Sequence, residues 1–115
     1  FEVNGGSSEP GPESRSVGQL ASFTERFAGS INAGQGAVDI PLGVRLPALD
    51  AKLNYHPANE RLVLQLVDQN NRVVAESSDK SLTVANLAEG RYTLRVAGSP
   101  SRPVDFVIKG RQASL

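Results

Sequence analysis

Few residues in this chain could carry chemistry, and His56 is the only histidine among the 115 residues. A nucleophilic triad would need His56 beside a serine and a carboxylate. A zinc site would need three further carboxylate ligands, because the chain has no cysteine. The sequence contains no Gly-x-Ser-x-Gly elbow, and His56 precedes Pro57 in a segment typical of a turn. We therefore predict no catalytic residues and no enzymatic activity.

Two polar loops offer the oxygen ligands that calcium prefers. The first contains Asp68 and Asn70, and the second contains Asp79. Asp and Asn also favour turns, because they tolerate a left-handed backbone and bond to their own chain. The EF-hand spacing with its closing glutamate is missing. We interpret both segments as turns, keep these three residues as the calcium candidates, and expect no other cofactor.

Basic residues form the remaining candidate site. Arg91 and Arg95 alternate along one predicted strand, and Lys109 and Arg111 follow near the end of the chain. If these four share a face, they could recognise an acidic partner, although a solvated face is the commoner explanation of such a pattern. Twelve basic and twelve acidic residues give zero net charge, which argues against a nucleic-acid partner.

The elements that must position these residues are strands. Apolar residues alternate with polar ones, without a helical period, over residues 21–32, 38–42, 49–55, 73–76, 82–84, 92–96 and 104–108. Residues 62–67 are apolar at nearly every position, as in a central strand. This pattern predicts an all-β fold, an antiparallel β-sandwich of immunoglobulin-like or jelly-roll-like type with about eight short strands.

Five aromatic residues follow the apolar phase of their strands, which assigns them to the core: Phe23, Phe27, Tyr55, Tyr92 and Phe106. That assignment leaves no aromatic platform on which sugars or bases could stack.

The segment over residues 82–96 predicts two half-buried strands joined at Gly90, with Tyr92 just after the turn. In β-sandwiches, a tyrosine at such a corner bonds through its hydroxyl to nearby backbone. Gly90 and Tyr92 are therefore the predicted structural residues.

The composition divides the chain into three parts. Residues 1–18 are rich in Gly, Ser, Pro and charge, which predicts a flexible linker at the end of a preceding domain. Residues 19–110 form the sandwich, and residues 111–115 are expected to fray. Because the chain starts at Phe1, we expect a processed product or an excised segment with a domain upstream. The sequence has no run of 18 apolar residues, so we predict no membrane span. We expect the protein to be a monomer.

Residues 23–109 resemble the bacterial pre-peptidase C-terminal domain, a β-sandwich appended to secreted proteases and surface proteins. The matching segments are residues 27–31 (FAGSI), 64–77 (LQLVDQNNRVVAES) and 87–96 (LAEGRYTLRV), the last following the family pattern L-x-x-G-x-Y-x-x-x-V. The family commonly carries Asp-x-Asp where Asn59, Glu60 and Arg61 stand here.

The resemblance implies a non-catalytic accessory module of a larger secreted or cell-surface bacterial protein. Such a module would assist export, processing, substrate adhesion or surface placement of an attached hydrolase, which the resemblance implies to be a protease. The alternative is an extender or binding domain of a surface adhesin. In either case the partners would be the upstream domain and a protein, peptide or glycan ligand.

Overall fold

The computed structural model describes residues 21–114, so the predicted linker over residues 1–18 lies outside the described residues. Within this range the chain forms eight strands: β2 (Ser22–Ile31), β3 (Gly36–Val44), β4 (Ala48–His56), β5 (Val63–Asp68), β6 (Val73–Ser77), β7 (Ser81–Val84), β8 (Gly90–Gly98) and β9 (Val104–Ala113). All paired strands run antiparallel. Residues 21–114 include no helix long and apolar enough to cross a membrane.

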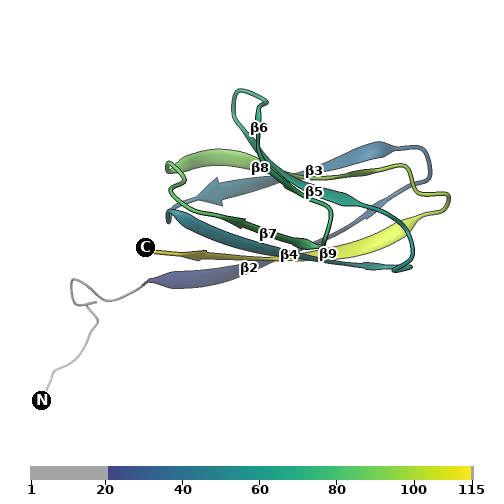
Figure 1. Ribbon diagram of the computed structural model, residues 1–115, viewed down its shortest axis with the longest axis horizontal. Coiled ribbons are helices and arrows are strands. Elements are labelled where there is room, and N and C mark those ends of the chain that lie inside the picture. The colour runs from purple at the N-terminus through teal and green to yellow at the C-terminus, as the bar shows by residue number, and fades with distance from the viewer. Residues whose placement is uncertain (1–20, 115) are drawn as a thin grey trace, which may run out of the picture.

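The strands form two four-stranded sheets that pack face to face (Figure 1). One sheet has the order β2-β9-β4-β7 and the other has the order β3-β8-β5-β6. At the two sides of the sandwich, β2 contacts β3 and β6 contacts β7. The predicted antiparallel β-sandwich of about eight strands is therefore confirmed.

The core lies between the sheets and follows the period-2 alternation of the sequence. Its members are the inward-facing aliphatic residues of both sheets, among them Ile31, Leu42, Leu53, Leu64, Leu66, Leu94, Val96 and Ile108. Of the five aromatic residues assigned to the core, Phe106 is fully buried. Phe27, Tyr55 and Tyr92 pack half-buried against the core, and Phe23 is half-buried outside this cluster.

The hairpin predicted over residues 82–96 is wrong, because β7 and β8 belong to different sheets. β7 pairs with β4, whereas β8 lies between β3 and β5. Residues 85–89 therefore cross from one sheet to the other. The backbone N–H of Leu87 donates to the carbonyl oxygen of Pro47 at 2.9 Å and fixes this crossing. Alternation reveals where two strands lie along the chain, but not whether they pair with each other.

The predicted frayed tail is wrong for residues 111–113, which complete β9. Gln112 is 1% exposed, and the backbone N–H of Ser114 donates to the carbonyl oxygen of Ala21. The polar composition of this segment suggested fraying. In the sandwich, β2 and β4 flank β9 on both sides and hold the end of the strand.

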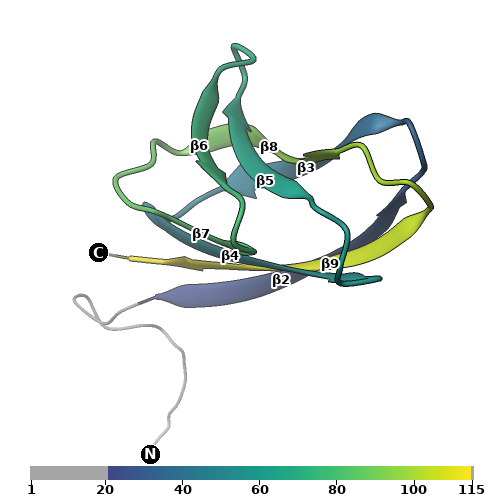
Figure 2. The same cartoon turned by 45° about the vertical axis from the view of Figure 1, so that its right-hand side comes forward.

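The β5–β6 hairpin rises from the sandwich on the side away from the β2-β9-β4-β7 sheet (Figure 2). Its register shifts between Leu66, which faces Ala75, and Val67, which faces Val73. Val74 is therefore an extra residue, as in a β-bulge, and such bulges bend and twist a strand. This bend carries the hairpin turn out over the outer face of the sheet.

Candidate functional site

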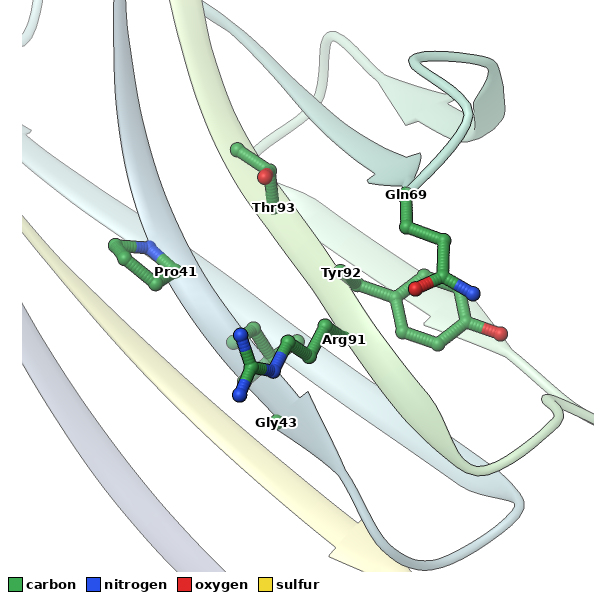
Figure 3. A pocket seen from close by; sticks show the side chains of 7 residues that line it. Pro41, Gly43, Gln69, Arg91, Tyr92 and Thr93 are labelled. Atoms are coloured by element: carbon green, nitrogen blue, oxygen red, sulfur yellow. The ribbon is translucent and has the colours of Figure 1, made fainter.

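An open cleft of about 430 Å³ lies on the outer face of the β3–β8 pair. Pro41 and Gly43 on β3 and Arg91 and Thr93 on β8 line it (Figure 3). Pro41 faces Thr93 and Gly43 faces Arg91. The four residues make two cross-strand pairs that neighbour each other on the outer face of the sheet. The residue between them on β3, Leu42, is buried in the core. The alternation of the strand thus turns Pro41 and Gly43 to the outside.

The cleft occupies space at Gly43 that a larger side chain would fill. A Cβ atom added at Gly43 would have no atom within 4 Å, so only the missing side chain keeps this position open. Figure 3 shows the guanidinium of Arg91 lying across β3 between Pro41 and Gly43. Arg91 is exposed, and no ion pair or hydrogen bond joins its side chain to another of residues 21–114. Its charge is therefore available to a partner.

A second cleft of about 160 Å³ adjoins the first. The two share Gln69, Arg91 and Tyr92 as lining residues, and the second extends to Asn70 and Glu89. Gln69 reaches the site from the turn of the raised β5–β6 hairpin (Figure 3). Arg91 thus lies where the two hollows meet, with the hairpin turn as a wall.

Asp68 and Asn70, the first calcium candidates, lie at the hairpin turn that borders the clefts. Oδ1 of Asp68 accepts hydrogen bonds from the backbone N–H groups of Asn70 and Arg72, both at 2.9 Å. Asn71 has a left-handed backbone with φ 63°, and its N–H donates to the Asp68 carbonyl oxygen at 3.0 Å. Asp68 therefore closes the turn by accepting hydrogen bonds from backbone N–H groups of the turn, which is the arrangement expected of an Asx turn.

The other calcium candidate, Asp79, lies in the β6–β7 loop, beyond the opposite end of β6 from Asp68. Its carboxylate accepts hydrogen bonds from the Ser77 hydroxyl and from the Ser81 N–H, and these bonds lower the pKa of Asp79. The structure does not bring Asp68 and Asp79 together. Residues 21–114 hold no group of three or more acidic or histidine side chains placed to share a metal ion.

Arg95 differs from Arg91 in being paired. Its Nε and a terminal nitrogen bind the two carboxylate oxygens of Asp39 at 2.7 and 3.2 Å. The hydrogen bond and the charge of Arg95 lower the pKa of Asp39, and the same contacts raise the pKa of Arg95. Arg95 also reaches the side-chain oxygen of Asn71 at 3.4 Å. Its charge is compensated on this face, which leaves Arg91 as the uncompensated neighbour.

The basic residues that the sequence grouped together lie on two different faces. Arg91 and Arg95 belong to the outer face of the β3-β8-β5-β6 sheet. Lys109 and Arg111 belong to β9 and point outward from the other sheet. The four residues therefore do not form one acidic-partner site, because β8 and β9 follow each other in the chain but lie in opposite layers.

His56 ends β4 in an exposed position, directly opposite Asp105 on β9, and Asp105 faces Ser30 on β2. The cross-strand row thus has the order Ser30, Asp105, His56. A nucleophilic triad needs the histidine between the serine and the carboxylate. Here the serine and histidine are separated by a whole strand, about 10 Å. This order cannot pass a proton from Ser30 to His56.

Tyr92 and Gly90 shape the corner that enters β8. The Tyr92 hydroxyl donates to the carbonyl oxygen of Ala88 at 2.9 Å, and Gly90 has φ 154°, a conformation that residues with side chains rarely adopt. A second tyrosine makes a similar contact that the sequence did not indicate. The Tyr55 hydroxyl donates to the carbonyl oxygen of Glu60 at 2.8 Å and fixes the turn after β4.

No pattern in the sequence predicted the cleft. Arg91 was expected to alternate with Arg95 along one strand, but nothing in the sequence marked Pro41 or Gly43 as its neighbour. Their proximity depends on the β3–β8 register, which pairs residues about 50 positions apart in the chain. Gly43 gave the only local signal, a small residue inside a strand, which often marks a close approach of a ligand or backbone.

Comparisons with known proteins find a similar fold among solved structures but no related sequence. No protein-family model matches this chain, and no curated protein matches it in sequence. Among solved structures, it is similar to Aeromonas hydrophila PliG, described as a periplasmic lysozyme inhibitor of g-type lysozyme. The match has a TM-score of 0.60 and 10% sequence identity, and it covers 81% of this chain and 88% of the PliG chain. At this identity the likeness concerns the fold.

This result corrects the predicted function. The prediction of an accessory module attached to a hydrolase is wrong. The matching structure is a lysozyme inhibitor and not a protease-linked module, and the match covers 88% of its chain. The adhesin alternative finds no support in the comparison either. The predicted motifs encode turns and core positions, which many β-sandwiches share, so they could not discriminate among functions. The resemblance to the pre-peptidase C-terminal domain stays a prediction.

Proposed function

We propose that this chain is a non-enzymatic inhibitor protein that acts outside the cytoplasm and binds a lysozyme. The contact surface is the pair of adjoining clefts on the β3-β8-β5-β6 sheet, with Arg91 at its centre. The observation that carries the proposal is the unpaired guanidinium of Arg91 above the open position of Gly43, considered within the described part of the chain.

The composition of the surface supports protein binding. Arginine and tyrosine are among the residue types that most often dominate the binding energy of protein interfaces, and both clefts are lined in part by Arg91 and Tyr92. The β5–β6 hairpin, whose turn supplies Gln69 to both clefts, also carries the exposed apolar residues Val73 and Val74, which are 48% and 43% exposed. An exposed cation beside apolar contact area and a shaped hollow is a suitable anchor for a partner of complementary charge.

A lysozyme offers that complementary charge. Glycoside hydrolases use a pair of carboxylic side chains at the bond that they cleave, so their substrate clefts carry negative charge. An inhibitor must place a cation there while it excludes substrate, and the free charge of Arg91 meets the electrostatic part of this requirement. The similarity of fold to a periplasmic lysozyme inhibitor adds independent support for this partner and for a location outside the cytoplasm.

The test uses the 115-residue chain and a g-type lysozyme, with a lysozyme of another type as comparison. Clearing of a peptidoglycan suspension measures inhibition, and isothermal titration calorimetry measures the dissociation constant. We expect inhibition with one-to-one binding. Arg91→Ala should weaken binding by about 2 kcal/mol, close to 30-fold, as truncation of a central arginine commonly does.

Arg61→Ala is the matched control, because Arg61 is also exposed and lies in the segment before β5, outside both clefts. Binding by the Arg61 variant should equal that of the unaltered chain. Equal losses in the two variants would assign the effect to net charge and reject the cleft. No inhibition of any lysozyme at micromolar concentrations would reject the proposed function as a whole.

A further inference from the structure

The face of the sandwich opposite the cleft carries a concentration of positive charge. Arg26 on β2 lies directly opposite Lys109 on β9, and Lys109 lies directly opposite Lys52 on β4. Directly opposed residues point to the same side of a sheet, and all three side chains are exposed. Arg111, two residues along β9, is exposed on the same side. We call these four residues the basic row.

Strand spacing gives the basic row its dimensions. Neighbouring strands lie about 4.8 Å apart, so Arg26, Lys109 and Lys52 are attached to the sheet at intervals of about 5 Å over a span of about 10 Å. Like charges placed directly opposite each other destabilise a sheet. Within residues 21–114, no ion pair compensates any member of the row. The arrangement costs stability unless an anion covers it.

The acidic residues on this face are few and lie beside the row or at its far end. Asp50 faces Arg111 across the β4–β9 pair, and its carboxylate also accepts a hydrogen bond from the Thr83 hydroxyl at 3.4 Å. Asp105 faces Ser30 and His56, four residues along β9 from Lys109. The centre of the sheet thus stays positive, and the charge decreases toward one end.

The other outward side chains exclude several kinds of ligand. Small or polar residues surround the basic row, namely Thr24, Ala28, Asn54, Ser81, Thr83 and Val107. None of these six is aromatic, and the exposed ring of His56 on this face lies at the end of β4, four residues from Lys52. Bases and neutral sugars therefore have no stacking platform beside the basic row. None of the six is large and apolar enough to enter a lipid bilayer. Recognition on this face must rest on the spacing of charges.

We propose that the outer face of the β2-β9-β4-β7 sheet binds an anionic polysaccharide, a linear chain that carries carboxylate, sulfate or phosphate groups. Arg26, Lys109 and Lys52 would contact successive anionic groups across the strands, and Arg111 would contact the polymer on one side of this line. A linear polymer suits this face because Arg26, Lys109 and Lys52 lie in one line across three neighbouring strands. An acidic protein would need an apolar, aromatic-rich interface centre, which this face does not offer.

The test measures binding of the whole chain to three polysaccharides and a single-stranded DNA oligomer by isothermal titration calorimetry at several sodium chloride concentrations. Heparin and polygalacturonate represent anionic polysaccharides, and dextran is the neutral one. We expect both anionic polymers to bind at low salt, with an association constant that falls steeply as salt rises, and no binding of dextran. A slope between two and four on the log–log salt plot would match the number of cations in the row.

The decisive variant is Arg26→Gln/Lys52→Gln/Lys109→Gln. Its matched control, Arg61→Gln/Arg72→Gln/Arg91→Gln, removes the same charge from exposed positions elsewhere. The first variant should lose on the order of tenfold or more in affinity and about two to three units of salt slope. The control should lose little. Because the first variant removes like-charge repulsion, its melting temperature should not fall, so lost binding would not reflect unfolding.

Equal losses in both triple variants would overturn the proposal in favour of unspecific charge attraction. Tighter binding of the single-stranded DNA oligomer than of heparin or polygalacturonate would assign the face to nucleic acid. Binding of dextran would show that recognition does not depend on charge. No binding of any polymer at 20 mM salt would also reject it. Because Arg91 lies on the other sheet, lysozyme inhibition by the first triple variant should be unchanged, which separates this proposal from the cleft.

Discussion

Gln112 donates a hydrogen bond from Nε2 to the carbonyl oxygen of Gly43 at 2.8 Å. Its Oε1 accepts from the backbone N–H groups of Arg45 at 2.8 Å and Leu46 at 3.2 Å. The side chain is 1% exposed, so one buried amide joins β9 of one sheet to the end of β3 in the other. The backbone that it holds includes the floor of the Arg91 cleft.

Replacement of this amide should therefore destabilise the whole sandwich. Gln112→Met keeps the length and bulk of the side chain but leaves partly buried backbone groups at Gly43, Arg45 and Leu46 without this partner. We expect the free energy of unfolding to fall by about 2–3 kcal/mol, measured from the urea midpoint at constant slope. Gln65→Met is the control, since Gln65 bonds only to the exposed side chain of Glu76, and it should cost less than about 1 kcal/mol. A loss at Gln112 no larger than at Gln65 would contradict this role.

The Tyr92 corner should make a smaller contribution. Tyr92→Phe removes the hydroxyl that donates to Ala88 and leaves the ring against the core, so we expect a loss of about 1 kcal/mol. Tyr55→Phe, which removes the bond to Glu60 at the other turn, should cost about as much. Thermal melting of both variants and of the double variant gives the comparison. The two effects should add, since the turns after β4 and before β8 share no hydrogen bond. An unchanged melting temperature for Tyr92→Phe would remove the corner from the stabilising contacts.

The sequence predicted strands well because alternation is a local property, and every predicted strand segment falls in an observed strand apart from residues at its ends. It failed where distant register decides the outcome. Residues 82–96 look like a hairpin, yet β7 and β8 separate into two layers. The polar Gln112 looked like part of a frayed end, yet its three hydrogen bonds make burial favourable. The cleft and the basic row arise from pairings between segments far apart in the chain, which no local pattern encodes.

The Arg95–Asp39 pair should give stability a modest dependence on pH. The folded-state pKa of Asp39 lies below its unfolded value, so the protein gains stability above the unfolded pKa and loses it as the pH falls through the folded pKa. The Asp39 side chain is 52% exposed, and solvent screening should limit the effect to about 1 kcal/mol at most. Urea unfolding at pH 7 and pH 3 should show a smaller difference for Asp39→Asn than for the unaltered chain. A difference of the same size would show that the pair does not contribute.

Two glycines should respond in opposite ways to the same substitution. A Cβ at Gly98 would lie 2.8 Å from both the Arg61 carbonyl oxygen and Cδ2 of Leu62, so Gly98→Ala should destabilise the protein by about 1–3 kcal/mol. A Cβ at Gly43 would meet no atom within 4 Å, and Gly43→Ala should leave stability unchanged or raise it by about 0.5–1 kcal/mol through the chain entropy of glycine. Urea midpoints measure both effects, and a loss at Gly43 as large as that at Gly98 would contradict the open geometry.

The same open position separates function from stability at the cleft. Gly43→Leu should fold as well as Gly43→Ala, because its side chain extends into the cleft of about 430 Å³ rather than into the core. Its longer side chain should nevertheless compete for space with the Arg91 guanidinium, which lies over β3 between Pro41 and Gly43 (Figure 3). We expect the leucine variant to lose lysozyme inhibition and the alanine variant to keep most of it, with equal melting temperatures. If a folded leucine variant inhibits as strongly as the unaltered chain, the lysozyme must bind elsewhere, since a partner anchored at Arg91 cannot share this space with a leucine side chain.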